Sequence, residues 1–227
     1  MTALLVITTF VALIAIDYFF GLPAVEEQFG SNTLREKVPR PLAFSFEPAW
    51  VGGYNLPDGF HYHRGHTWAR KIDPLHFVVG IDDFGGKLLG SVAKIQLPKP
   101  GERLRQGALG ARAGTNGRTA DLVAPVNGEV VELNPELQTR PNLLVDDPYG
   151  RGWLMKVRAS DMESDFHNLL DGRLAQRWTE DAGEQLELQL MALSGSVLQD
   201  GGRPAADFAR HLEDEDWRRL VGEFLLT

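Results

Sequence analysis

The sequence contains no cysteine. This absence excludes disulfides, thiolate zinc sites, iron–sulfur clusters held by cysteine and cysteine nucleophiles, although it says little about the compartment in which the protein works. Any chemistry at a site must therefore come from other side chains.

Basic residues are too few to give the protein a positive field. The 227-residue chain has 23 lysines and arginines against 31 aspartates and glutamates, for a net charge of -8. This balance argues against nucleic acid as a partner and against attraction to an anionic bilayer surface. With 43% hydrophobic residues, the length suits one ordinary globular domain with additions.

Motifs of the common catalytic classes are absent as well. The sequence has no glycine-rich phosphate loop, no nucleophile elbow and no pattern typical of a catalytic triad. We therefore expect that the protein is not an enzyme.

The first segment is an apolar run typical of a membrane anchor. Residues 3–20 (ALLVITTFVALIAIDYFF) number 18 and contain one charge, Asp17. As a helix they would span roughly 27 Å, close to the hydrocarbon thickness of a bilayer. A cleaved signal peptide is the competing interpretation, but no positive residue precedes the run and no good small-x-small cleavage site follows it.

The charges that flank this run predict its orientation. No lysine or arginine precedes it, whereas Arg35, Lys37 and Arg40 follow it, and the positive-inside rule then places the bulk of the protein in the cytoplasm. We expect residues 1–21 to be a single-pass transmembrane anchor in the inner (cytoplasmic) membrane, in contact with integral membrane protein subunits.

Residues 22–59 indicate a linker or an extended arm. Pro39, Pro41 and Pro48 interrupt a stretch of mixed charge without sustained periodicity. Aromatic residues of this stretch, Trp50 among them, could form an edge strand docked on the domain or an aromatic surface for a partner.

The central part of the chain has the pattern of a small β-domain. Short β-branched runs are cut by glycine, proline and asparagine at the spacing expected of a sandwich or barrel. Gly85-Gly86 and Leu88-Leu89 indicate a short helical or turn segment, and the Asn-Gly of residues 125–128 favours a hairpin turn. The candidate strands are His76–Val79, Ser91–Gln96, Ala108–Ala113, Ala120–Val123, Gly128–Leu133 and Trp153–Val157.

Three blocks in this region make a resemblance specific. Residues 60–70 read FHYHRGHTWAR, residues 79–101 read VGIDDFGGKLLGSVAKIQLPKPG, and residues 124–157 read APVNGEVVELNPELQTRPNLLVDDPYGRGWLMKV. In this order they resemble the H protein of the glycine cleavage system, a family that carries lipoate. The resemblance implies a lipoyl-domain fold over residues 60–170, mainly β, in which two small antiparallel sheets form a barrel-sandwich hybrid with short helices.

The resemblance also points to a missing residue. H proteins attach lipoate to a lysine at a hairpin tip, and counting back from Pro125 places this position at Gly117. The glutamate that usually lies three residues earlier corresponds to Gly114. Arg118 is adjacent, but a guanidinium stays protonated and is no acylation nucleophile, and a shift that puts Asn116 at the tip restores no acceptor either. We expect a chain that is not lipoylated and has no cofactor.

For two other groups of polar residues we expect structural roles. His61, His63 and His66 lie close enough in sequence to bind zinc or copper, but His66 belongs to the family motif and the spacing alone is a weak signal, so we expect no metal site. The carboxylate pairs at 82–83 and 146–147 fall inside the family blocks, where they favour turn formation over catalysis.

Residues 171–227 extend beyond the resemblance as a predicted helical extension. We expect a helix interrupted near Gly183, a loop over residues 195–204, and a final helix with apolar residues at helical spacing. That last helix either packs back on the domain or docks on a partner, with Trp217, Phe224 and Leu225 as its anchors.

The sequence favours a non-enzymatic role. We expect a membrane-anchored, H-protein-like interaction module that acts as a structural or accessory subunit of a larger membrane complex, an electron-transfer or photosynthetic assembly being one such class. The alternatives are a group carrier of the glycine cleavage type that serves membrane-associated enzymes, and a metal-binding or sensory domain that uses the histidines near residue 63.

Overall fold

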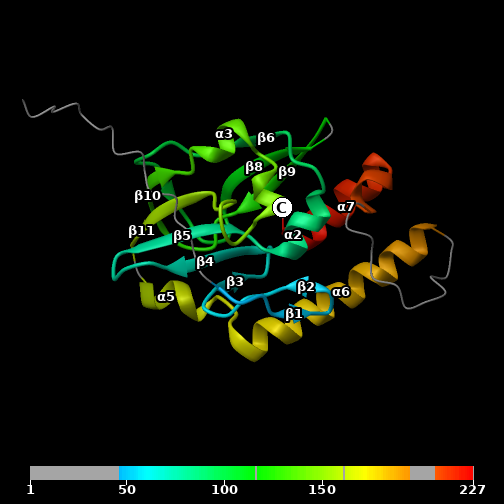
Figure 1. Cartoon of the computed structure of the whole chain (residues 1–227), viewed down its shortest axis with the longest axis horizontal. Helices are drawn as coiled ribbons and strands as arrows, with labels where there is room; N and C mark the ends of the chain where they lie inside the picture. Colours follow the sequence, from blue (N-terminus) through cyan, green and yellow to red (C-terminus); the bar gives the residue numbers. More distant parts are fainter. Residues whose placement is uncertain (1–45, 116, 161, 195–207, 227) are drawn as a thin grey trace, which may run out of the picture. The chain divides into compact units, whose positions relative to one another are not determined.

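A computed structural model describes residues 46–115, 117–160, 162–194 and 208–226 (Figure 1). The expected transmembrane anchor and most of the expected arm lie outside these residues. Within the described part of the chain, no helix is both long and apolar enough to cross a membrane.

The larger sheet has six antiparallel strands in the order β3-β4-β5-β11-β10-β7. Its central strand β5 is apolar nearly throughout, because one face contacts the main core and the other contacts a second cluster of aromatic residues. The strands are β3 (His61–His63), β4 (Thr67–Lys71), β5 (His76–Ile81), β7 (Arg103–Leu104), β10 (Gly128–Leu133) and β11 (Met155–Ala159).

A smaller sheet contains β6 (Lys94–Gln96), β8 (Leu109–Thr115) and β9 (Arg118–Val123), in the order β6-β8-β9. Side chains from both sheets meet in one core, with Phe77 and Val157 from the larger sheet and Ala113 and Leu122 from the smaller. The expected β-domain of two antiparallel sheets is therefore present. A two-stranded hairpin, β1 (Trp50–Val51) with β2 (Tyr54–Asn55), precedes it.

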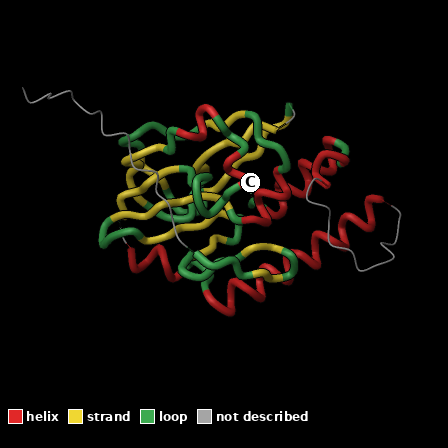
Figure 2. Tube along the Cα trace, viewed as in Figure 1, coloured by secondary structure: helices red, strands yellow, loops and turns green. Residues whose placement is uncertain are grey.

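Most of the helical residues lie below and to the right of the strands in the view of Figure 2. The short helix predicted around the Gly85-Gly86 pair is α2. Within the described residues the helices are α2 (Asp83–Leu89), α3 (Glu136–Thr139), α4 (Leu143–Asp146), α5 (Met162–His167), α6 (Gly172–Ser194), the 3-10 helix η1 (Phe208–His211) and α7 (Asp214–Phe224).

Two local expectations are wrong. Helix α6 continues through Gly183. The glycine allows close packing rather than ending the helix, since a Cβ there would lie 3.1 Å from Cε2 of Tyr54. The turn over residues 125–128 does not close a hairpin, since β9 and β10 belong to different sheets. Asn127 instead accepts a hydrogen bond from the Gln106 backbone and donates to Asp165.

Candidate functional site: the β8–β9 hairpin and the region around His66

The β8–β9 hairpin places Gly117 at its tip. Thr115 and Arg118 are the last paired residues, and Gly117 lies between the two strands, in the turn. Gly117 has a φ of 81°, which a glycine adopts without steric cost. Among the described residues, no atom lies within 4 Å of where its Cβ would be, so the space beside Gly117 is open, and the glycine itself offers no side chain for chemistry.

Arg118 ties this hairpin to the C-terminal segment. Its Nε donates to Oδ1 of Asp214 at 2.6 Å, and its NH2 donates to the carbonyl of Leu212 at 2.7 Å. A third hydrogen bond goes to the carbonyl of Ala209, and the guanidinium lies 5.4 Å from the centre of the Trp217 ring. Only 16% of the Arg118 side chain is exposed. We call this set of contacts the Arg118 clamp.

The C-terminal helix packs back on the domain. Trp217 is 1%, Phe224 6% and Leu225 0% exposed, and all three belong to the main core. The Trp217 indole N–H donates to the carbonyl of Leu88 in α2, at 3.1 Å. Of the two arrangements considered for this helix, the structure has the packed one, so these three residues cannot anchor a partner unless α7 leaves the domain.

Trp50 remains an exposed interaction candidate. Its side chain is 68% exposed at the start of β1, with the Lys87 ammonium 5.7 Å from the ring centre. An exposed tryptophan is a common anchor at protein interfaces.

Lysines are found near the hairpin but not at its tip. Lys94 in β6 pairs with Gly114 in β8 and is exposed to solvent. Lys87 instead bonds to Asp83 and to the carbonyl of Gly53, and Lys156 bonds to Glu132. Lys94 is therefore the lysine that lies beside the hairpin stem.

The three neighbouring histidines do not converge. His61 faces Asp171 at 3.6 Å, the Nδ1 of His63 accepts a hydrogen bond from the Gly65 backbone, and His66 is the last residue of the β3–β4 turn. Burial lowers the pKa of His61 and of His63, and the positive charge of Arg64 lowers the latter further. In the part of the chain that the structure describes, no three His, Cys, Asp or Glu side chains gather around a metal position.

His66 is the most constrained of the three. Its ring is 1% exposed and stacks on Phe84 on one face, at 4.0 Å, and on Trp178 on the other, at 4.5 Å. Its Nδ1 lies 2.8 Å from Oδ2 of Asp82, whose other oxygen accepts the Gly85 N–H at the start of α2. The backbone φ of His66 is 56°, a conformation uncommon for residues other than glycine.

Buried tyrosines behind this region have structural roles. Burial raises the pKa of Tyr62 and of Tyr149, so both hydroxyls stay protonated at neutral pH. The Tyr149 hydroxyl donates to the carbonyl of Asn55 and accepts from the Asp83 backbone, and it thereby joins the β1–β2 hairpin to α2. The carboxylate pair at 82–83 is likewise engaged in capping and hydrogen bonding.

Sequence reasoning did not find the Arg118 clamp. Arg118 and Asp214 are 96 positions apart, and no pattern links an arginine in a turn to an acid in a distant helix. The one available signal was the resemblance, which directed attention to the hairpin tip.

Comparison with known proteins gives a consistent match. Residues 60–182 match the family model described as glycine cleavage H-protein. A probable glycine cleavage system H protein of Pyrococcus abyssi (strain GE5 / Orsay) is 33% identical over 121 residues, which is 53% of this chain and 90% of that protein. The glycine cleavage system H protein of Escherichia coli O7:K1 (strain IAI39 / ExPEC) is 36% identical over 127 residues, 56% of this chain and 98% of that protein.

A solved structure also matches. The crystal structure of a glycine cleavage system H protein from Mycobacterium marinum aligns with a TM-score of 0.49 and 27% identity, covering 56% of this chain and 99% of that one. The family match ends inside α6. Ala209, Leu212, Asp214 and Trp217, the partners of Arg118, therefore lie outside it.

Proposed function

The chain belongs to the glycine cleavage H-protein family, and from this premise we propose that it is a member that no longer carries a lipoyl group and acts instead as a non-enzymatic accessory module of a membrane complex. The first support is chemical. The position that corresponds to the family's lipoyl lysine is Gly117, which has no amine to acylate.

The Arg118 clamp is the observation that carries this proposal. In a carrier, the hairpin tip must be free to enter the sites of enzymes. Here the residue next to the tip holds the chain's own C-terminal segment by three hydrogen bonds and a ring contact. A hairpin used in this way has a structural role, because it holds the C-terminal segment against the domain.

The membrane part of the proposal depends on the apolar run at residues 3–20. Its length and composition suit a single membrane span, which would hold the domain beside integral membrane subunits. The exposed Trp50 gives the domain one candidate contact with them.

The test of the non-carrier role is a lipoylation assay on the full-length chain. The chain is co-produced with a lipoate ligase and free lipoate, next to the Escherichia coli relative as a positive control, and intact masses are recorded. We expect the relative to gain a lipoyl-sized mass and this chain to gain none. A lipoyl-sized increment on any lysine, with Lys94 the first to inspect, would restore the carrier role.

The variant Gly117→Lys distinguishes two reasons why the chain would not be lipoylated, the missing amine and the Arg118 clamp. We expect it to be modified far less than the relative, because Gly114 replaces the glutamate of the recognition sequence and Arg118 still holds the C-terminal segment. Complete modification of this variant would show that the clamp does not restrict access to the tip.

The accessory role is tested by purification from native membranes in mild detergent. We expect a set of integral membrane proteins to co-purify at fixed stoichiometry with an unmodified chain. A chain that elutes alone from native membranes contradicts the accessory role but leaves the non-carrier conclusion unaffected.

A further inference from the structure

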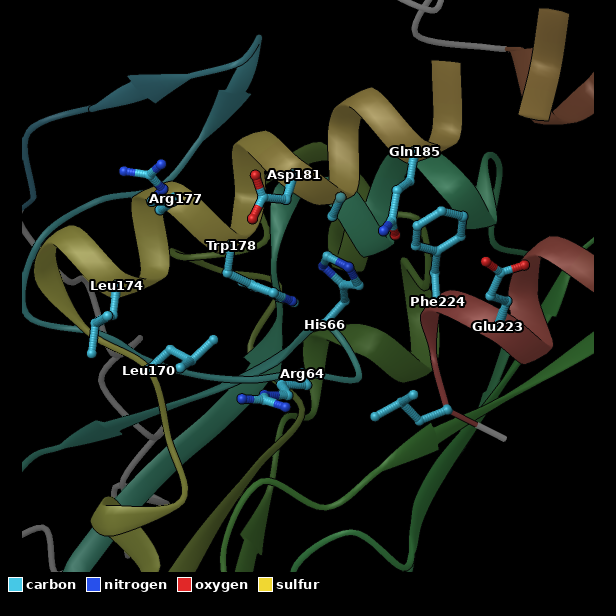
Figure 3. Close-up of a pocket in the computed structure, with 12 residues that line it drawn as sticks. Arg64, His66, Leu170, Leu174, Arg177, Trp178, Asp181, Gln185, Glu223 and Phe224 are labelled. Carbon is cyan, nitrogen blue, oxygen red and sulfur yellow. The ribbon is translucent and has the colours of Figure 1, made fainter. Parts of the chain in front are cut away.

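A groove of about 510 Å³ lies between α6, the end of α7 and the β3–β4 turn (Figure 3). This volume is within the range of small-molecule sites in proteins. The elements that bound it include α7, which lies outside the family match. The family match therefore does not cover one wall of the groove, and the residues that line the groove are outside β8 and β9.

Apolar side chains make up half of the residues that line the groove. In Figure 3 the His66 ring lies between Trp178 on α6 and Phe224 on α7. Leu170, Leu174 and Leu226 extend the apolar surface. Leu174 is 69% and Leu226 52% exposed, although large apolar side chains normally avoid this much water. An apolar ligand body would cover them.

The floor of the groove is the edge of His66. The Asp82 carboxylate can only accept hydrogen bonds, so Nδ1 of His66, 2.8 Å from Oδ2 of Asp82, is assigned a proton. In the tautomer that has this proton alone, the remaining nitrogen, Nε2, is an acceptor. The hydrogen bond described for the His66 ring is the one at Nδ1, and the ring is one of the side chains that line the groove.

Nitrogen donors accompany this acceptor. Figure 3 shows the Trp178 ring extending from α6 toward His66, with Arg64 on the opposite side. Neither the Trp178 indole N–H nor the Arg64 guanidinium has a hydrogen-bond or ion-pair partner in the described chain, and the same holds for Arg177 at the rim. Two acids, Asp181 and Glu223, line the groove as well, and Gln189 donates a hydrogen bond to Glu223.

We propose that this groove binds a small organic acid that has an apolar body, a carboxylate and one hydrogen-bond donor. The carboxylate accepts from Arg64 and the Trp178 indole, the apolar body covers the leucines, and the donor is accepted by Nε2 of His66. A guanidinium–carboxylate contact is stronger than a neutral hydrogen bond, so Arg64 supplies most of the affinity and His66 supplies selectivity. This inference does not depend on the accessory role.

The test uses three soluble probes on the full-length chain in nanodiscs, by isothermal titration calorimetry. They are 3-phenylpropionate, its para-hydroxy derivative 3-(4-hydroxyphenyl)propionate, and the cation 3-phenylpropylamine. We expect the hydroxylated acid to bind about tenfold more tightly than 3-phenylpropionate, and the amine to bind least, because one good hydrogen bond is worth about a factor of ten.

Substitutions of Arg64, Trp178 and His66 each test one proposed contact with the ligand. Arg64→Gln should weaken both acids about tenfold and leave their ratio unchanged, and Trp178→Phe should weaken both while keeping the stacked ring. His66→Asn, chosen because asparagine tolerates a positive φ, should bring the two acids to equal affinity. Arg173→Gln, an exposed arginine on α6 that does not line the groove, is the matched control and should change nothing.

Three results would overturn the proposal. The first is equal affinity for the amine and the acids, and the second is no binding of either acid at millimolar concentration. The third is a preference for the hydroxylated acid that persists in the His66→Asn variant, provided that its circular dichroism and thermal unfolding match those of the parent chain.

Discussion

At the scale of single residues, Arg118 offers the most direct experiment. Replacing it with alanine should leave the carbonyls of Ala209 and Leu212 without their donor and loosen the C-terminal segment. We expect a loss of about 1–3 kcal/mol, most of it from the carbonyl contacts, because Asp214 is 64% exposed and its ion pair is weakened by solvent. Urea unfolding and hydrogen exchange over residues 208–226 measure the effect.

The control for this variant is Arg112→Ala. Arg112 lies in the same sheet and pairs with Asp121, but it is 46% exposed and contacts no C-terminal residue in the described chain. It should change stability by less than about 1 kcal/mol. Equal effects of the two substitutions would contradict the clamp.

His63 makes stability depend on pH. Burial lowers its pKa below the ordinary value of 6.5, so the folded chain binds a proton less readily than the unfolded chain. Its contribution to the unfolding free energy is therefore complete above the unfolded pKa and is lost as pH falls from about 7 towards 5. We expect His63→Gln to flatten this part of the stability curve, and Gln96→Ala, an exposed strand position, to leave its slope unchanged.

The measurement is urea unfolding at a series of pH values. His61 contributes in the same direction, because burial lowers its pKa as well, so the single variant removes part of the slope. A slope in the His63→Gln variant as steep as in the parent chain would refute the assignment.

At the scale of elements, helix α2 depends on Asp82. Its two oxygens cap the helix at Gly85 and hold the buried imidazole of His66. Asp82→Ala removes both contacts and should cost about 2–4 kcal/mol in unfolding free energy. Asp82→Asn keeps an oxygen for the cap and should cost about half as much, and chemical denaturation distinguishes the two. Identical denaturation midpoints for both variants would contradict the dual role.

Strand positions were predictable where each strand has its own apolar pattern. Strand β10 (Gly128–Leu133) matches the predicted strand, and β5 begins at the predicted His76. Periodicity could not define β3 and β4, because His61, His63 and Arg70 place polar residues on strands at the side of the sheet. The course of α6 past Gly183 depends on the packing of Tyr54, which no local pattern contains.

The candidate site was predictable only in part. Counting back from Pro125 in the family pattern predicts that Gly117 occupies the hairpin tip. The register of β8 and β9 places Gly117 in the turn between them. Neither the partners of Arg118 nor the groove beside His66 could be predicted, because both require α7 to lie against β9 and the β3–β4 turn. Such tertiary contacts are determined by the whole core.

At the scale of the whole molecule, the C-terminal segment completes the core. Five large side chains of this segment, Trp217, Leu220, Val221, Phe224 and Leu225, belong to the same cluster as the two sheets. Their burial is worth about 10 kcal/mol as an upper estimate, comparable with the total stability of a domain. We expect a chain that ends at residue 207 to lose cooperative thermal unfolding and to bind an apolar dye.

The comparison is made with the full-length chain by calorimetry and dye fluorescence. An unchanged, cooperative transition in the shortened chain would show that the sheets form a stable core without α7. The control Leu188→Ser changes an exposed residue of α6 and should leave the transition in place.

The Arg118 clamp has a consequence for any protein that approaches the hairpin from outside. The C-terminal segment is a ligand joined to its own receptor by the chain, so its effective concentration at the hairpin is on the order of millimolar. An external protein that binds the same surface must displace it, and its apparent affinity falls in proportion to the fraction of molecules in which the segment is released. Proteins that bind this surface weakly are therefore excluded. A partner can compete only if it also provides another binding surface for α7.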